Sequence, residues 1–338
     1  MTASPRSLNR LLVTGGAGFI GSNFVRLLAR ERPRVDVTVL DKLTYAGNRA
    51  NLDGLDVRFV EGDICDADTV DRLAGSVDAI VNFAAETHVD RSLLDPLSFV
   101  RTDTLGVAVL SEAARRHEHE VFLHVSTDEV YGHVAADRST ETDALHPRSP
   151  YSASKAGGEH LAMSYHVSFG VPVVITRGSN NYGPHQFPEK MVPVMVTNAL
   201  DGLPLPLYRD GTAVRDYLHV DDHCRAIDLV LHSAPAGEVY NVGTGVETSG
   251  NEVARMVIDL IGRGEIEYVA DRAGHDYRYA LSTAKIRALG WEPRVSLRDG
   301  LAATVDWYRQ NEDWWRPLRS AEYWEYYRRN YRPLNATT

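Results

Sequence analysis

Residues 11–21 read Leu-Leu-Val-Thr-Gly-Gly-Ala-Gly-Phe-Ile-Gly, and this stretch decides the fold. Its apolar start predicts a buried strand, whereas apolar residues from Phe19 onward recur at helical spacing. The glycines at 15, 16, 18 and 21 therefore fall between a strand and a helix. Glycine lets such a turn tighten and lets the backbone approach a pyrophosphate, whose charge the helix N-terminus stabilises. The stretch predicts a dinucleotide-binding turn.

Short β-branched runs alternate with helical periodicity through the first 180 residues, which is typical of a parallel sheet built from βαβ units. The expected strands cover residues 11–14, 35–40, 57–61, 79–83, 121–126 and 173–176. The expected helices cover residues 19–32, 67–73, 96–117 and 151–169. Together they predict an α/β fold with a doubly wound parallel sheet of the Rossmann type, whose ligand crevice lies beyond the carboxyl ends of the strands.

The pattern changes after Asn180, where Gly and Pro residues punctuate short segments and the regular βαβ repeat stops. We therefore expect two domains. Residues 1–180 form an NAD-binding Rossmann domain, and residues 181–338 mainly form a smaller α+β substrate-binding domain, with some of its segments returning to the Rossmann sheet. The smaller domain is expected to lie over the crevice as a lid.

The composition is that of an ordinary globular protein, with 43% hydrophobic and 24% charged residues among 338. A formal net charge of −10 argues against a broad nucleic-acid-binding surface. No apolar run approaches the roughly 20 residues of a membrane-spanning helix, and the polar start does not resemble a secretory signal. Two cysteines, Cys65 and Cys224, cannot supply a disulfide framework or a thiolate zinc site, so we expect a cytoplasmic protein without a metal.

Acidic and small residues follow the expected strands where a dinucleotide would lie. Asp41 ends the second strand twenty positions after Gly21, and a carboxylate there accepts hydrogen bonds from an adenosine ribose. Because that carboxylate would repel a 2′-phosphate, the sequence favours NAD over NADP. The expected NAD-binding residues are Gly15, Gly18, Phe19, Ile20, Gly21, Asp41, Lys42, Thr44, Asp63, Ile64, Ala84, Ala85, Tyr151 and Lys155.

Tyr151 and Lys155 follow Pro150, which favours a helix start, and their i, i+4 spacing places them on one helical face. A nearby ammonium favours the phenolate, so we expect the pKa of Tyr151 to lie below its usual value of about 10. Such a phenolate can remove a proton from a sugar hydroxyl. The glycine-rich turn and this motif together resemble the extended short-chain dehydrogenase/reductase family over nearly the whole chain. Because that family contains epimerases, dehydratases, decarboxylases and reductases, the two motifs leave the reaction open.

The segment after the fifth expected strand separates these reactions. Residues 125–132 read Val-Ser-Thr-Asp-Glu-Val-Tyr-Gly, and the adjacent carboxylates Asp128 and Glu129 supply an acid and a base that hydride transfer alone does not require. The Thr-Asp-Glu run is similar to that of dTDP-glucose 4,6-dehydratases, as are residues 84–92, 179–184, 187–190, 215–217 and 271–276. This resemblance implies conversion of dTDP-glucose to dTDP-4-keto-6-deoxyglucose and water. The implied catalytic residues are Thr127, Asp128, Glu129, Tyr151 and Lys155.

The same resemblance implies a role for each of these groups. Tyr151, assisted by Lys155, takes the C4 hydroxyl proton while the C4 hydride passes to NAD, and Thr127 holds the C4 oxygen. Glu129 removes the C5 proton, Asp128 protonates the departing C6 hydroxyl, and the hydride returns to C6. The implied substrate-binding residues are His88, Thr127, Asn180, Asn181, Glu189, Lys190, Arg215, Asn241, Arg272 and His275.

Two residues depart from the family pattern: Gly178 stands where Cys or Ser is usual, and Asp103 stands where Asn is usual. Three other interpretations stay open, namely a nucleotide-sugar 4-epimerase, a UDP-sugar dehydratase of the same family, and a non-catalytic NAD-binding protein on this fold. The long helices expected at residues 96–117 and 151–169 resemble those that pair across a two-fold axis in the family. We therefore expect a homodimer.

Overall fold

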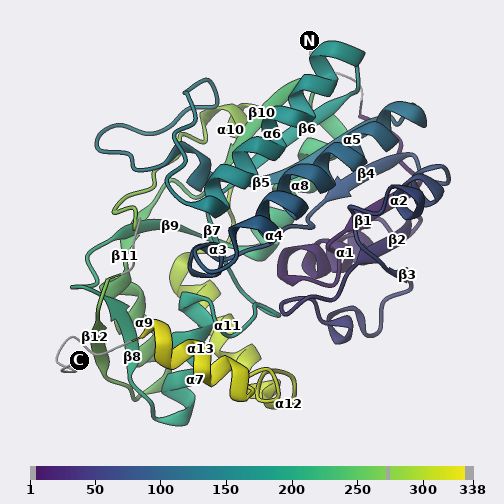
Figure 1. Ribbon diagram of the computed structural model, residues 1–338. Coiled ribbons are helices and arrows are strands. Elements are labelled where there is room, and N and C mark those ends of the chain that lie inside the picture. Colours follow the sequence, from purple (N-terminus) through teal and green to yellow (C-terminus); the bar gives the residue numbers. More distant parts are fainter. Residues whose placement is uncertain (1–4, 272–274, 332–338) are drawn as a thin grey trace.

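The computed structural model describes residues 5–271 and 275–331 (Figure 1). Its centre is a seven-stranded parallel sheet in the order β10-β6-β5-β4-β1-β2-β3, which confirms the predicted Rossmann fold. Six of its strands come from the first 178 residues of the chain. They are β1 (Arg10–Thr14), β2 (Asp36–Asp41), β3 (Arg58–Glu61), β4 (Ala79–Asn82), β5 (Val121–Thr127) and β6 (Val173–Gly178).

Both faces of this sheet are covered by helices, so each strand contributes side chains to two cores. Leu11 and Val13 of β1 pack with helices α1 (Phe19–Glu31) and α8 (Val220–Ser233). Leu12 lies on the other face and packs with α2 (Ala67–Ala74), α5 (Val107–Arg116) and α6 (Pro150–Phe169). Alternation along the pleat explains why this near-continuous apolar run forms a strand buried on both sides.

The helix expected over residues 96–117 is interrupted. Helix α4 (Pro96–Val100) passes into a π-helical turn, η2 (Arg101–Gly106), before α5 begins. Glycines of α6 allow this turn to approach closely, because a Cβ on Gly158 would lie 2.2 Å from the carbonyl oxygen of Asp103. The π turn therefore brings Asp103 against α6. Helical periodicity alone could not predict it, since a π turn adds only one residue per turn.

The second half of the chain adds strands both to the central sheet and outside it. Strand β10 (Glu238–Val242) pairs with β6 at the edge of the seven-stranded sheet. A three-stranded sheet contains β7 (Asn180–Tyr182), β9 (Val214–His219) and β11 (Glu247–Ser249), and a two-stranded sheet contains β8 (Leu205–Tyr208) and β12 (Ile266–Val269).

A third core holds the second group of elements together around Tyr182, Tyr308 and Trp315. It is formed largely by α7 (Met191–Asp201), α9 (Gly250–Ile261), α11 (Leu297–Gln310) and α12 (Glu312–Trp315). Helix α13 (Ala321–Asn330) lies beside these helices in Figure 1. Among the described residues, none of the helices has the length and apolar character that crossing a membrane requires. The remaining short elements are η1 (Arg49–Leu52), α3 (Val89–Ser92), η3 (Asp128–Tyr131) and α10 (Ala284–Ala288).

Candidate active site

The glycine-rich turn has a backbone that only glycine fits. Gly15 has a φ of +70°, and a Cβ there would lie 2.4 Å from the backbone nitrogen of Ala84. A Cβ on Gly21 would lie 2.3 Å from the carbonyl oxygen of Gly15. The first turn of α1 can therefore pack tightly against the turn, leaving the helix N-terminus facing a cavity.

This cavity suits a dinucleotide, because a helix N-terminus and a buried acidic residue both border it. Asp41 at the end of β2 accepts hydrogen bonds from Ala17 N and Leu43 N, each 2.9 Å long. Lys42, the residue after Asp41, is paired with Asp63, with 2.8 Å between Nζ and Oδ2. The carboxylate of Asp63 therefore offsets the positive charge that Lys42 places beside Asp41. All the predicted NAD-binding residues line the cavity except Asp63, which reaches it only through Lys42.

The predicted acid and base, Asp128 and Glu129, lie directly after strand β5. Its last residue, Thr127, accepts a 3.3 Å hydrogen bond from Glu129 N and so caps the 3₁₀ turn η3 that carries both carboxylates. Asp128 is 3% exposed, and its Oδ2 atom is buried without a hydrogen-bond partner in the described part of the chain. Burial, followed by the neighbouring Glu129 charge, raises the pKa of Asp128 well above its usual value. Burial therefore favours the protonated form of Asp128, which is the form that can donate a proton.

Tyr151 lies in the first turn of α6 and borders the dinucleotide cavity described above. Ser149 and Ser152 form a capping box around this helix start, and Pro150 occupies its first turn as predicted. The expected direction of the pKa shift of Tyr151 is wrong for this structure. Burial, with a further contribution from Glu129, raises that pKa well above 10, whereas a hydrogen bond with Thr127 acts to lower it.

The position of Lys155 explains why it does not reverse that shift. Its Nζ donates a 2.8 Å hydrogen bond to the carbonyl oxygen of Val125, and the side chain is 4% exposed. Burial lowers the pKa of Lys155, while Asp103 and Glu159 act to raise it. Lys155 lines the NAD cavity, whereas Tyr151 lines both that cavity and the adjoining one. The ammonium thus lies on the cofactor side of the tyrosine.

Asp103 links the active-site helix to the loop after β4. Its carboxylate accepts a 2.7 Å hydrogen bond from Ser154 Oγ and a 2.9 Å bond from Glu86 N. The side chain is fully buried, and burial raises its pKa to about 7 against the opposing effect of Lys155. Position 103, where the family usually has Asn, therefore carries a titratable carboxyl group close to Tyr151 and Lys155.

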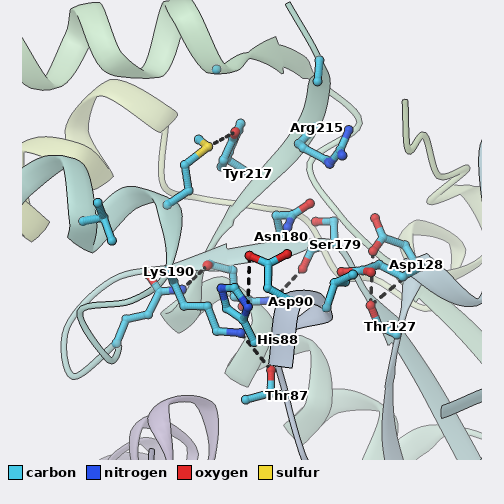
Figure 2. A pocket seen from close by; sticks show the side chains of 18 of the residues that line it. Thr87, His88, Asp90, Thr127, Asp128, Ser179, Asn180, Lys190, Arg215 and Tyr217 are labelled. Carbon is cyan, nitrogen blue, oxygen red and sulfur yellow. Dashed lines mark hydrogen bonds and ion pairs between the residues drawn. The ribbon is translucent and has the colours of Figure 1, made fainter. Parts of the chain in front are cut away.

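A second cavity adjoins the first and holds most of the predicted substrate-binding side chains. Figure 2 shows Thr127 and Asp128 on one side, Lys190 on the other, and Arg215 and Tyr217 further along. Lys190 lines both cavities and donates a 3.0 Å hydrogen bond to Thr87 Oγ1. The predicted residues found here are Thr127, Asp128, Glu129, Tyr151, His88, Asn180, Asn181, Lys190, Arg215 and His275.

Two predicted substrate-binding residues lie elsewhere. Glu189 is buried behind the cavity and pairs with Arg91, with 2.9 Å between Oε2 and Nη2. Asn241, on β10, accepts a hydrogen bond from the Tyr131 hydroxyl and donates one to the carbonyl oxygen of Ser139. Both side chains therefore organise the protein rather than line its cavity. Arg272 lies outside the described residues.

The Gly178 departure has a local steric reason. A Cβ at this position would lie 2.6 Å from Cε1 of His223, whose imidazole also lines the second cavity. His223 Nδ1 and Asn181 Oδ1 are 3.0 Å apart, and burial lowers the pKa of this histidine to about 4. Glycine thus leaves room for a neutral imidazole that orients a predicted substrate-binding residue.

Sequence reasoning also missed several residues that line the second cavity. Thr87 and Asp90 belong to residues 84–92, which resembled the family, but neither residue was predicted to line the substrate cavity. The sequence carried no signal for the aromatic members, because packing tyrosines and ligand-binding tyrosines look alike in a sequence. The missed aromatic lining residues are Tyr208 and Tyr331, whereas Tyr217 belongs to the segment 215–217 that resembled the family.

Comparison with known proteins identifies the group to which this site belongs. A family model described as GDP-mannose 4,6 dehydratase matches residues 12–304. A dTDP-glucose 4,6-dehydratase from Streptomyces niveus is 52% identical over 324 residues, covering 93% of this chain and 96% of the relative. The chain belongs to the nucleotide-sugar 4,6-dehydratase family.

Solved structures agree with this membership. The dTDP-glucose 4,6-dehydratase DesIV from Streptomyces venezuelae, solved with NAD and a further ligand bound, has a TM-score of 0.89 and is 53% identical. That comparison covers 91% of this chain and 99% of DesIV. The UDP-glucose 4-epimerase of Thermus thermophilus, solved with NAD, has a TM-score of 0.85 at 36% identity, covering 89% of this chain and 99% of the epimerase. Dehydratases and epimerases therefore share this fold, and the reaction depends on the site.

Proposed function

We propose that the protein is an NAD-dependent dTDP-glucose 4,6-dehydratase, a lyase that forms dTDP-4-keto-6-deoxyglucose and water. The single observation that carries this proposal is the pair Asp128 and Glu129 in the same cavity as Tyr151. An epimerase needs the tyrosine and the cofactor but has no elimination to catalyse. A buried carboxyl group whose pKa is raised, such as Asp128, can serve as the acid in a reaction that expels a hydroxyl group.

The chemistry requires a fixed order of steps. A C5 proton is too weakly acidic to remove until C4 has become a ketone, so oxidation comes first. NAD held by the residues of the first cavity would supply the hydride acceptor for C4 and the hydride donor for C6. Tyr151 takes the C4 hydroxyl proton while Thr127 holds the C4 oxygen. Glu129 then removes the C5 proton, and Asp128 gives its proton to the leaving C6 hydroxyl.

The two cavities suit a division of labour. Residues 1–180 hold the cofactor and the catalytic set, and residues 181–338 mainly hold the nucleotide-sugar. Arg215 supports this assignment because its planar fork suits a diphosphate, and it lies 8% exposed at the cavity wall. We place the enzyme in the cytoplasm as a homodimer. Two free thiols suit a reducing compartment, and exposed apolar side chains along α4, η2 and α6 suit a dimer interface.

A direct assay tests the reaction. The purified protein is incubated with dTDP-glucose, and the product is examined by mass spectrometry. Loss of one water from the sugar nucleotide supports the dehydratase. An isomer of unchanged mass would instead identify a 4-epimerase, and no turnover with bound NAD would favour a non-catalytic protein. UDP-glucose, assayed in parallel, measures the preference between the two nucleotides.

A further inference from the structure

The C-terminal end of the described chain reaches the substrate cavity. Tyr331, directly after α13, lines this cavity, and its ring centroid lies 5.7 Å from that of Tyr208, another lining residue. Burial raises the pKa of the Tyr331 hydroxyl well above its usual value. Both α13 and Tyr331 lie beyond residue 304, where the match to the family model ends. The cavity therefore has a wall outside the part of the chain that the family model matches.

Helix α13 is firmly docked rather than loosely attached. The Tyr323 hydroxyl donates a 3.1 Å hydrogen bond to the carbonyl oxygen of Pro188, in the segment before α7. Asn198 of α7 donates a 2.8 Å hydrogen bond to the Tyr327 hydroxyl. Just before the helix, Arg319 pairs with Asp201, with 2.7 Å between Nη1 and Oδ2. These contacts fix the helix along α7, so Tyr331 is presented from a supported position.

The same helix contacts a predicted substrate-binding residue directly. The Tyr326 hydroxyl lies 3.1 Å from Nδ1 of His88, and the two rings meet edge to face. His88 has a φ of +86°, a conformation that non-glycine residues rarely adopt and that surrounding contacts must maintain. The guanidinium of Arg91 lies over the Tyr326 ring at 4.8 Å. Tyr326 therefore helps to hold His88 at the cavity wall.

The position of Tyr331 indicates which part of a ligand it would meet. The catalytic residues occupy the end of the cavity where a sugar must lie. Tyr331 lies beside Tyr208, and Pro206, Leu207 and Tyr208 of β8 give this cavity an apolar and aromatic stretch, bordered by Asp90, whose carboxylate accepts a 3.1 Å hydrogen bond from the Tyr208 hydroxyl. A planar pyrimidine base suits such a wall, because aromatic faces and edges pack on it without a fixed hydrogen-bond pattern.

We propose that α13 completes the nucleotide-sugar site, with Tyr331 packing against the nucleoside and Tyr326 positioning His88. The inference rests on the proposed function, since it takes a pyrimidine nucleoside diphosphate sugar as the ligand. It adds a binding element from outside the family model. Enzymes that share the catalytic residues but have no such helix would differ from this protein in nucleotide affinity rather than in chemistry.

Substitution of Tyr331 gives the first test. Tyr331→Ala should raise both the KM for dTDP-glucose and the dissociation constant of dTDP about tenfold, with a smaller effect on kcat. Tyr331→Phe keeps the ring and should lose less affinity. Tyr268→Ala is the matched control, because this tyrosine is 39% exposed and lines neither cavity. A folded Tyr331→Ala protein with unchanged KM and dTDP affinity would overturn the proposal.

Hydrogen exchange of the unmodified holoenzyme gives a second test that does not depend on how the variants fold. Addition of dTDP should slow amide exchange in residues 321–331 as well as in residues 205–217. Slowing confined to residues 205–217 would show that the nucleotide binds without α13 and would overturn this inference alone. Slowing in neither segment would overturn the nucleotide specificity of the proposed function, and this inference with it.

Discussion

Burial raises the pKa of Asp128 and so favours its protonated form, and substitution of this residue should therefore separate oxidation from elimination. Asp128→Asn should leave Tyr151 able to drive oxidation at C4, but hydroxide is a poor leaving group without a proton. Enzyme-bound NADH should therefore accumulate, while water loss slows by about 10²–10⁴-fold. Nicotinamide absorbance in a single turnover, followed beside mass spectrometry, measures both steps. Asp143→Asn, in an exposed turn, is the control. Dehydration of Asp128→Asn at the unmodified rate would remove the residue from the mechanism.

Glu129 and Tyr151 should fail at different steps. Glu129→Gln should still permit oxidation but should slow the loss of deuterium from substrate labelled at C5. Tyr151→Phe should suppress oxidation itself, because the C4 hydroxyl then has no base. The two variants are compared in the same single-turnover experiment. If Glu129→Gln binds substrate normally yet forms no NADH, the residue acts before elimination, and the epimerase interpretation gains ground.

Asp103 should impose a pH dependence on stability. Its pKa rises from 3.8 to about 7 on folding, so the folded state holds a proton that the unfolded state has lost between these values. Stability contributed by this site should fall as the pH rises from about 4 to 7 and then level off, by a few kcal/mol in total. Asp103→Asn keeps the shape without the charge, so its stability relative to the unmodified protein should increase over that window. Urea unfolding at several pH values measures this difference, and a constant difference would contradict the shift.

Individual residues show where sequence reasoning succeeds and where it stops. The glycine turn and Asp41 could be predicted because their chemistry follows from spacing along the chain. The pKa of Tyr151 could not, since burial dominates it and burial is a property of the assembled cavity. Asn241 resembled a ligand-binding residue, but its side chain is satisfied by Tyr131 and Ser139 inside the fold.

At the scale of elements, the contact between η2 and α6 sets the position of the catalytic tyrosine and lysine. Two adjacent glycines of α6 face this turn, and they differ in what an added methyl group would meet. On Gly158 it would lie 2.2 Å from a backbone oxygen of Asp103, whereas on Gly157 it would lie 3.1 Å from the Thr104 Oγ1 atom. A backbone cannot yield as a side chain can, so the pair forms a matched experiment.

Gly158→Ala should therefore displace α6 and lower both stability and kcat. Overpacking of this kind costs roughly 1–3 kcal/mol. Gly157→Ala should cost much less, since alanine favours a helix by about 1 kcal/mol over glycine and the Thr104 side chain can rotate. Urea unfolding and steady-state kinetics compare the two. Equal effects from both substitutions would show that close backbone approach is not what holds α6 in place.

Helices and strands with clear periodicity were predicted within a few residues, from β1 to α6. The π turn escaped prediction because its cause, the close approach of Gly158, lies more than fifty residues away along the chain. The sequence predicted that some later segments return to the central sheet but did not identify β10 as one of them, since β7, α7, β8, β9 and α8 separate it from its partner β6. The local sequence pattern predicts whether a segment forms a helix or a strand. Contacts with elements that are distant in the sequence determine its irregularities and its position in a sheet.

At the scale of the whole molecule, one surface remains apolar in the isolated chain. Leu97 is 77% exposed on α4, Val100 and Leu105 are each 50% exposed beside it, and Val167 and Phe169 are exposed near the end of α6. Helices α5 and α6 lie next to each other on one side of the sheet in Figure 1. Exposed apolar side chains along α4, η2 and α6 indicate an interface, and a two-fold arrangement would bury them against a second copy.

The protein should therefore behave as a homodimer in solution, with the apolar surface of α4, η2 and α6 at the two-fold axis. Light scattering at micromolar concentration should give the mass of two chains. Leu97→Asp should shift the protein toward monomers, because a carboxylate buried at an apolar interface loses its hydration without gaining a partner. Val246→Asp, 62% exposed but outside this apolar surface, should leave the mass unchanged. Since Tyr151 belongs to α6 and Asp103 to η2, both of which contribute to this surface, the monomers should also lose activity. An unmodified protein with the mass of one chain would rule out this assembly and its influence on the catalytic helix.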